Sequence, residues 1–235
     1  MQKKYYTFNA EELRAILFGA IGLAFIISFN EWGVTTFDLG YGLRHLFNAF
    51  LIVILSFLVH LSVQRVLALW FGFKAEYRVW LYGLGIGLVL VIVSRGRLWF
   101  LAPGGIVVYH MVGHRLGSFR YGLNYWPLGL VGMSGPMASV ILAIFFKFLL
   151  GYMPDNVLLQ KALVFNIWYA IVTMLPIPPL DGSHTFFASR LFYTFWLGVV
   201  IGLCLALYFL PIWAAFLIGL LMGLVIIYLT YGLLK

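Results

Sequence analysis

Long apolar segments follow one another along this chain, separated only by short polar stretches. A helix of about 20 apolar residues is long enough to cross the hydrocarbon core of a bilayer. The pattern therefore predicts an all-α polytopic membrane protein with about six to seven transmembrane helices. The expected spans lie at about 14–30, 46–71, 79–93, 127–150, 158–176, 190–209 and 212–233.

The composition agrees with this fold class and excludes others. Hydrophobic residues make up 64% of the 235 residues and charged residues 9%, whereas soluble proteins average about 45–50% and 25%. A water-soluble enzyme is therefore excluded, and we expect a single membrane domain over 1–235 in a multi-pass protein of the cell membrane. The net charge of +8 is expected at the lipid headgroups, because no basic run indicates a nucleic-acid partner.

Local signals mark where regular structure begins and where it is interrupted. Asn9 is expected to cap a helix that begins at Ala10. The Pro-Gly-Gly sequence at 103–105 breaks an apolar segment, which predicts a re-entrant segment or a short hairpin near 98–125 that other parts of the protein cover. The last two spans carry almost no polar residues, so 190–235 is expected to form a C-terminal helix pair.

The sequence LPIPPLDGS at 175–183 is the clearest candidate for a functional site. Its prolines keep the backbone extended, and Gly182 supplies a turn beside Asp181. An acidic residue at the end of an apolar span is costly and suggests function, although a loop with a solvated aspartate would give the same spacing. A second candidate, His60, lies within the span 46–71, so the two side chains suggest a metal site inside the membrane. The prolines are Pro176, Pro178 and Pro179.

Four segments, in order, resemble the site-2 protease-type intramembrane zinc metalloproteases. Residues 56–78 resemble the zinc-binding helix of that family, and 134–139, which contain Gly135 and Pro136, resemble its Gly-Pro helix start. The proline-rich Asp-Gly sequence resembles the segment that closes the active site. Residues 101–108 resemble archaeal members, which favours an archaeal cell membrane. The resemblance implies a site-2 protease-like core over about 46–190.

The resemblance also shows where this chain departs from the family pattern, which is an HExxH motif with a distant aspartate. His60 takes the position of the first histidine and Asp181 that of the aspartate. The glutamate position holds Leu61, the second histidine position holds Gln64, and a family asparagine position holds Thr173. Leucine cannot accept a proton from water, and only two good zinc ligands remain. The sequence therefore predicts a catalytically inactive homologue, a pseudoprotease without a cofactor.

Three further histidines are possible metal ligands. His110 and His114 would share a face if their segment were helical. His184 follows Asp181 by one helical turn and could join it and His60. The alternative is that all three lie at the polar interface and bind no metal.

Arg65 follows the degenerate motif on the same helix. We expect its aliphatic stem to lie along apolar surface while the guanidinium group reaches the interface. An ion pair with Asp181 or Glu76 is the alternative.

These observations favour a protein that binds or scaffolds transmembrane partners, as a subunit of a membrane complex. The alternative is an active intramembrane zinc metalloprotease with an atypical ligand set. A transporter or channel is a weaker third hypothesis, because the sequence has no inverted repeat and no ring of like charges.

Overall fold

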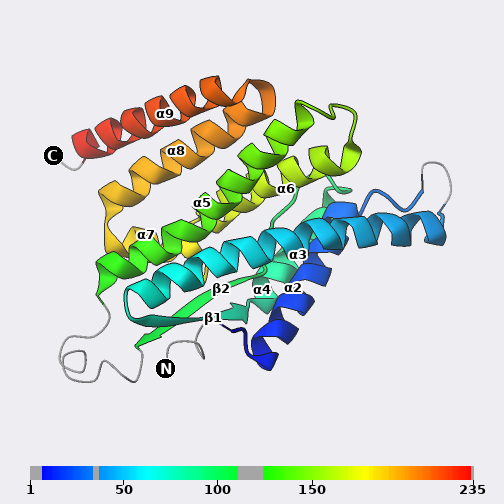
Figure 1. Cartoon of the computed structure of the whole chain (residues 1–235), viewed down its shortest axis with the longest axis horizontal. Coiled ribbons are helices and arrows are strands. Elements are labelled where there is room, and N and C mark those ends of the chain that lie inside the picture. The colour runs from blue at the N-terminus through cyan, green and yellow to red at the C-terminus, as the bar shows by residue number, and fades with distance from the viewer. Residues whose placement is uncertain (1–6, 34–36, 111–123, 234–235) are drawn as a thin grey trace.

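The computed structural model describes residues 7–33, 37–110 and 124–233, and these form a bundle of helices with one small sheet (Figure 1). The helices are α2 (Ala10–Ser28), α3 (Leu39–Trp70), α4 (Leu81–Val93), α5 (Tyr125–Leu150), α6 (Val157–Thr173), α7 (Asp181–Ala188), α8 (Arg190–Phe209) and α9 (Ile212–Leu233). The strands are β1 (Phe73–Val79) and β2 (Gly104–His110). Helices therefore dominate the described residues, as the apolar segments predict.

Four of the described helices, α3, α5, α8 and α9, are long and apolar enough to cross a membrane. The expected span at 79–93 is a helix of only 13 residues, α4, which covers about 20 Å and is shorter than the hydrocarbon core. Helix α6 is also short, with 17 residues. The apolar helices support a membrane protein, whereas the total of six to seven spans stays a prediction.

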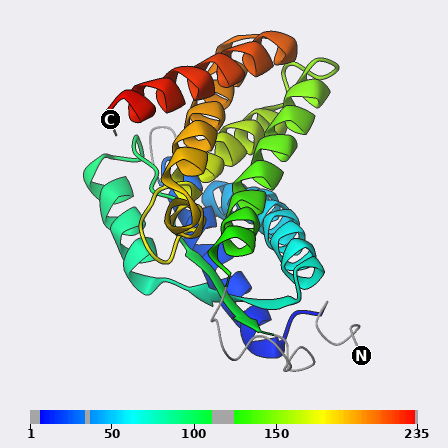
Figure 2. The same cartoon turned by 90° about the vertical axis from the view of Figure 1, so that its left-hand side faces the viewer.

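Strands β1 and β2 pair antiparallel, with Phe73 opposite His110 and Val79 opposite Gly104. Figures 1 and 2 show them on the side of the bundle away from α8 and α9. Strand β2 lies within the segment 98–125, for which a re-entrant segment or a short hairpin is predicted, and it pairs with the upstream strand β1. Residues 111–123 of that segment lie outside the described residues. Charged Lys74, Glu76 and Arg78 alternate along β1 with the buried side chains of Phe73, Ala75 and Tyr77, which is the pattern of a strand with one buried face.

A buried carboxylate holds the start of α2 to this sheet. Asn9 caps α2 as predicted, and the backbone N–H of Asn9 donates to Glu12 Oε2 at 2.9 Å. Glu12 Oε1 accepts from the backbone N–H of Tyr77 at 3.0 Å and from the guanidinium group of Arg65. One side chain therefore links α2, α3 and β1, at a point where Glu12 and Arg65 are both buried.

Both expectations for Arg65 are wrong. Its guanidinium group is buried rather than at an interface, and its partner is Glu12 rather than Asp181 or Glu76. Glu76 instead pairs with Lys74 on the same strand. The contact between Arg65 and Glu12 joins residues 53 positions apart, so no local sequence pattern could reveal it.

Helices α8 and α9 pack closely along glycine residues. A Cβ atom at Gly202 would lie 2.7 Å from the Cβ of Met222, and one at Gly219 would lie 2.7 Å from the Cβ of Leu203. Small residues of this kind let helix backbones approach each other in a membrane. Figure 1 shows the two helices side by side at one edge of the bundle.

Candidate functional site

His60 and Asp181 meet in the protein interior. His60 Nε2 lies 2.8 Å from Asp181 Oδ2, and His60 Nδ1 lies 2.9 Å from Ser139 Oγ. His60 is 1% exposed and Asp181 3% exposed. The three side chains come from α3, α7 and α5, and α5 runs between the other two helices in Figure 1. The structure thus brings together the two residues that the sequence singles out.

The proline-rich segment positions Asp181 at the first residue of α7. Leu180 N–H donates to the Ile177 carbonyl at 2.8 Å, which closes a turn just before the helix. A Cβ at Gly182 would lie 2.0 Å from the Met174 carbonyl oxygen, so only glycine fits where the segment folds back on α6. Since Asp181 is buried, the alternative of a solvated loop aspartate is wrong.

Gly135 allows α5 to approach α3 beside the histidine. A Cβ at this position would lie 2.3 Å from His60 Nε2 and 2.4 Å from Gln64 Nε2. Contacts this short are not possible for a real side chain, so any larger residue would force the helices apart. Gly135 therefore allows close packing of α5 against α3 at the histidine.

Several polar atoms around His60 lack a hydrogen-bond partner among the described residues. They are both side-chain polar atoms of Gln64, Asp181 Oδ1 and the hydroxyl of Tyr77. The Gln64 amide lies beside His60 Nε2, since both contact the space above Gly135. Unpaired buried polar groups are rare in proteins and call for an explanation.

These groups do not fit a catalytic zinc centre. Only His60 and Asp181 are usual zinc ligands, and they hydrogen-bond to each other. Within the part of the chain that the structure describes, no cluster of three or more His, Cys, Asp or Glu side chains could hold a metal ion. With the Gln64 amide oxygen added, the possible ligands would be the His60 imidazole, the Asp181 carboxylate and a neutral amide. An amide oxygen is a weak ligand for zinc.

A general base is also missing beside His60. Leu61, at the position of the family glutamate, is part of the hydrophobic core. Burial, and then the charge of Asp181, raise the pKa of Tyr77 above its usual value, so this phenol is neutral and is no base. The carboxylate of Glu12 is already held by Arg65 and the sheet. None of these groups is suited to remove a proton from water.

The remaining predicted residues lie outside this cluster. Thr173 donates to the Tyr169 carbonyl of its own helix at 2.8 Å. His184 Nε2 lies 3.2 Å from the Ile106 carbonyl oxygen, so the expectation that it joins Asp181 and His60 is wrong. His110 ends strand β2, which contradicts the helical spacing assumed for it, and His114 falls outside the described residues.

Two residues of the site were not foreseen from the sequence. Ser139 lies in the segment that resembles the family's Gly-Pro helix start, one helical turn after Gly135, and this spacing could have revealed it. Tyr77 lies in β1, and its proximity depends on the pairing of two distant strands. No local signal marks it.

Comparison with known proteins supports a distant relationship. A protein of Methanocaldococcus jannaschii named "Putative zinc metalloprotease MJ0611" is 26% identical over 182 residues, which cover 76% of this chain and 84% of the relative. No protein-family model and no solved structure matches the chain. The chain is thus similar to a protein that is named as a putative zinc metalloprotease.

Proposed function

We propose that this protein is a proteolytically inactive relative of the site-2 proteases that binds transmembrane partners within a membrane assembly. The observation that carries the proposal is the set of side chains that follow His60 on α3. Leu61 belongs to the hydrophobic core, and Gln64 lies one helical turn after His60. A zinc protease needs a carboxylate and a second histidine at these two positions.

The backbone around His60 and Asp181 is nevertheless closely packed. Gly182, Gly135 and Gly105 each occupy a place where a Cβ atom would clash with the site or with the proline-rich segment. A fold that keeps its close packing but lacks the catalytic side chains is suited to binding rather than to bond cleavage. The apolar helices support a binding surface within the bilayer, where the partner would be another transmembrane segment.

Metal content and cleavage provide the direct test. The protein is purified in mild detergent, zinc is measured by mass spectrometry, and model transmembrane substrates are incubated with it. We expect much less than one zinc per chain and no cleavage. Stoichiometric zinc, with cleavage that His60→Ala abolishes, would overturn the proposal.

A double variant provides the matched control. Leu61→Glu with Gln64→His restores the HExxH pattern on α3 without changing the proline-rich segment. If the missing groups alone explain inactivity, the double variant should take up zinc.

The wild-type protein from native membranes should in addition co-purify with a partner after cross-linking, whereas a chain that is always isolated would contradict the binding role.

One observation favours the alternative of a metalloprotease with an atypical ligand set. The Gln64 amide and Asp181 Oδ1 are buried next to His60 without partners among the described residues. Such a set would bind a cation through His60, Gln64 and Asp181. In that case Gln64→Met should remove zinc from the purified protein, a loss that the inactive protein would not show.

A further inference from the structure

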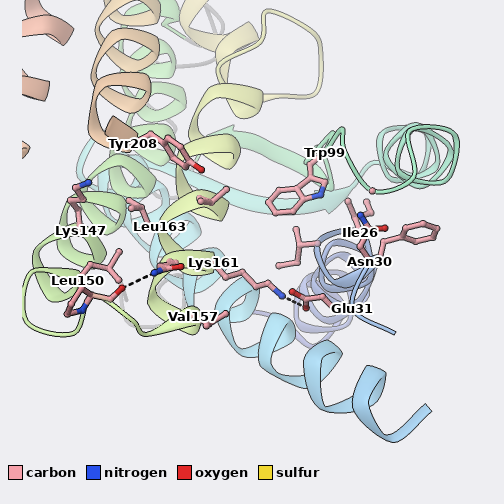
Figure 3. Close-up of a pocket in the computed structure, with 16 residues that line it drawn as sticks. Ile26, Asn30, Glu31, Trp99, Lys147, Leu150, Val157, Lys161, Leu163 and Tyr208 are labelled. Carbon is pink, nitrogen blue, oxygen red and sulfur yellow. Dashed lines mark hydrogen bonds and ion pairs between the residues drawn. The ribbon is translucent and has the colours of Figure 1, made fainter. Parts of the chain in front are cut away.

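A cavity of about 630 Å³ lies away from the His60 cluster, where α2, α5 and α8 end and α6 begins. We propose that it binds an anionic phospholipid, with the phosphate group at Lys147 and the acyl chains on the apolar wall. Figure 3 shows Lys161 reaching from α6 to Glu31, with Lys147 and Tyr208 on one side and Trp99 on the other.

The position of the cavity corresponds to the headgroup layer of a bilayer. Helices α5 and α8 are both long and apolar enough to span a membrane, and their last turns contribute Lys147 and Tyr208 to the lining. Helix ends of this kind lie where hydrocarbon gives way to headgroups. Trp99 and Tyr208 suit the same level, because their rings are partly apolar and partly polar.

The charge of the lining favours an anion. Lys147 and Lys161 are the basic lining residues and Glu31 is the acidic one. Glu31 pairs with Lys161 and also lies 3.2 Å from His45 Nδ1, so its charge is shared. Lys147 forms no ion pair with any described residue. A phosphate group would give Lys147 a charged partner.

The other polar groups of the lining already have partners. The Asn30 amide donates to the Arg95 carbonyl at 2.9 Å, and the Gln160 amide donates to the Pro154 carbonyl at 2.8 Å. The lysines are therefore the cationic groups of the lining that can hold a ligand. Apolar side chains form the rest of the wall, which suits a ligand that carries hydrocarbon as well as charge: Ile26, Ile27, Leu150, Leu163 and Val164.

Lipid binding can be measured on the purified full-length protein by native mass spectrometry in detergent. The probes are dioleoyl phosphatidylglycerol, dioleoyl phosphatidylcholine and the soluble headgroup glycerol phosphate. We expect one phosphatidylglycerol to bind more tightly than phosphatidylcholine, and glycerol phosphate to bind much more weakly because it lacks acyl chains. Equal binding of the two lipids would overturn the proposal, and glycerol phosphate binding as tightly as the lipid would indicate a soluble phosphate ligand instead.

Two variants locate the site. Lys147→Gln should weaken phosphatidylglycerol binding about tenfold, while Lys74→Gln, which removes the same charge from β1, should not change it. Glu31→Gln should lower the Kd about threefold, because it removes the negative charge of the lining that repels an anionic ligand. Each variant is first checked for the wild-type unfolding transition without lipid. An equal loss for Lys147→Gln and Lys74→Gln, or weaker binding by a folded Glu31→Gln protein, would contradict the assigned site.

Discussion

Replacing Gln64 by methionine tests directly whether the residue has a ligand. Both polar atoms of the Gln64 amide are buried next to His60 and have no partner among the described residues. Methionine has a similar length and shape but no group that needs a hydrogen bond. In an inactive protein the substitution should therefore remove a cost and leave the packing against Gly135 intact.

The size of the effect follows from the cost of an unpaired amide. A buried polar group without a partner costs about 1–3 kcal/mol in proteins. In a membrane the separated helix also leaves the amide poorly paired, and interhelical polar contacts average only about 0.6 kcal/mol. We therefore expect Gln64→Met to stabilise the protein by about 1 kcal/mol.

The measurement is equilibrium unfolding in mixed micelles of a mild detergent and sodium dodecyl sulfate, with zinc determined on the same samples. Gln160→Met is the control, because it is the same substitution at an exposed amide that is already hydrogen-bonded. Gln160→Met should change stability little. The reasoning would be refuted if Gln64→Met lowered the free energy of unfolding by about 1 kcal/mol or more beyond any loss in the control. A loss of that size is roughly the value of one hydrogen bond and would show that the amide has a partner in the folded protein.

Three other substitutions test the packing around the site by the same unfolding assay. Gly135→Ala should cost about 1–3 kcal/mol because its Cβ would meet the imidazole, whereas Gly85→Ala, with no atom within 4 Å, should not. Glu12→Ala should cost about 3–5 kcal/mol by leaving Arg65 buried without a partner, and methionine at both positions should recover most of it. Tyr77→Phe should not destabilise, since it removes an unpaired hydroxyl. Because the pKa of Tyr77 is raised, the unfolded chain loses a proton above about pH 10 that the folded chain keeps. Wild-type stability should therefore fall there more steeply than that of Tyr77→Phe.

The features predicted correctly from the sequence are those that depend on neighbouring residues. Asn9 caps α2 because its side chain acts on the adjacent turn. The turn predicted at Gly182 is wrong, because Gly182 lies within α7 and the turn closes before Asp181, between Ile177 and Leu180. His60 and Asp181 are 121 positions apart, and the sequence pairs them because both are polar residues of apolar segments and both match positions of the family pattern.

The features that were missed depend on distant partners. Strand β1 alternates apolar and charged residues, a signal that could have revealed it, whereas its pairing with the distant strand β2 leaves no local signal. The buried position of the Arg65 guanidinium group depends on its ion pair with Glu12, which lies on another helix. Helix α4 is shorter than a membrane span, because hydropathy does not show where a helix ends.

The contact between Gly105 and Pro179 gives the sheet a mechanical role. A Cβ at Gly105 would lie 1.8 Å from the Pro179 carbonyl oxygen, so strand and proline-rich segment touch backbone to backbone. Surfaces this close cannot slide past one another without separating. A displacement of β2 would therefore also displace Pro179 and, with it, Asp181, which lies two residues further along the chain.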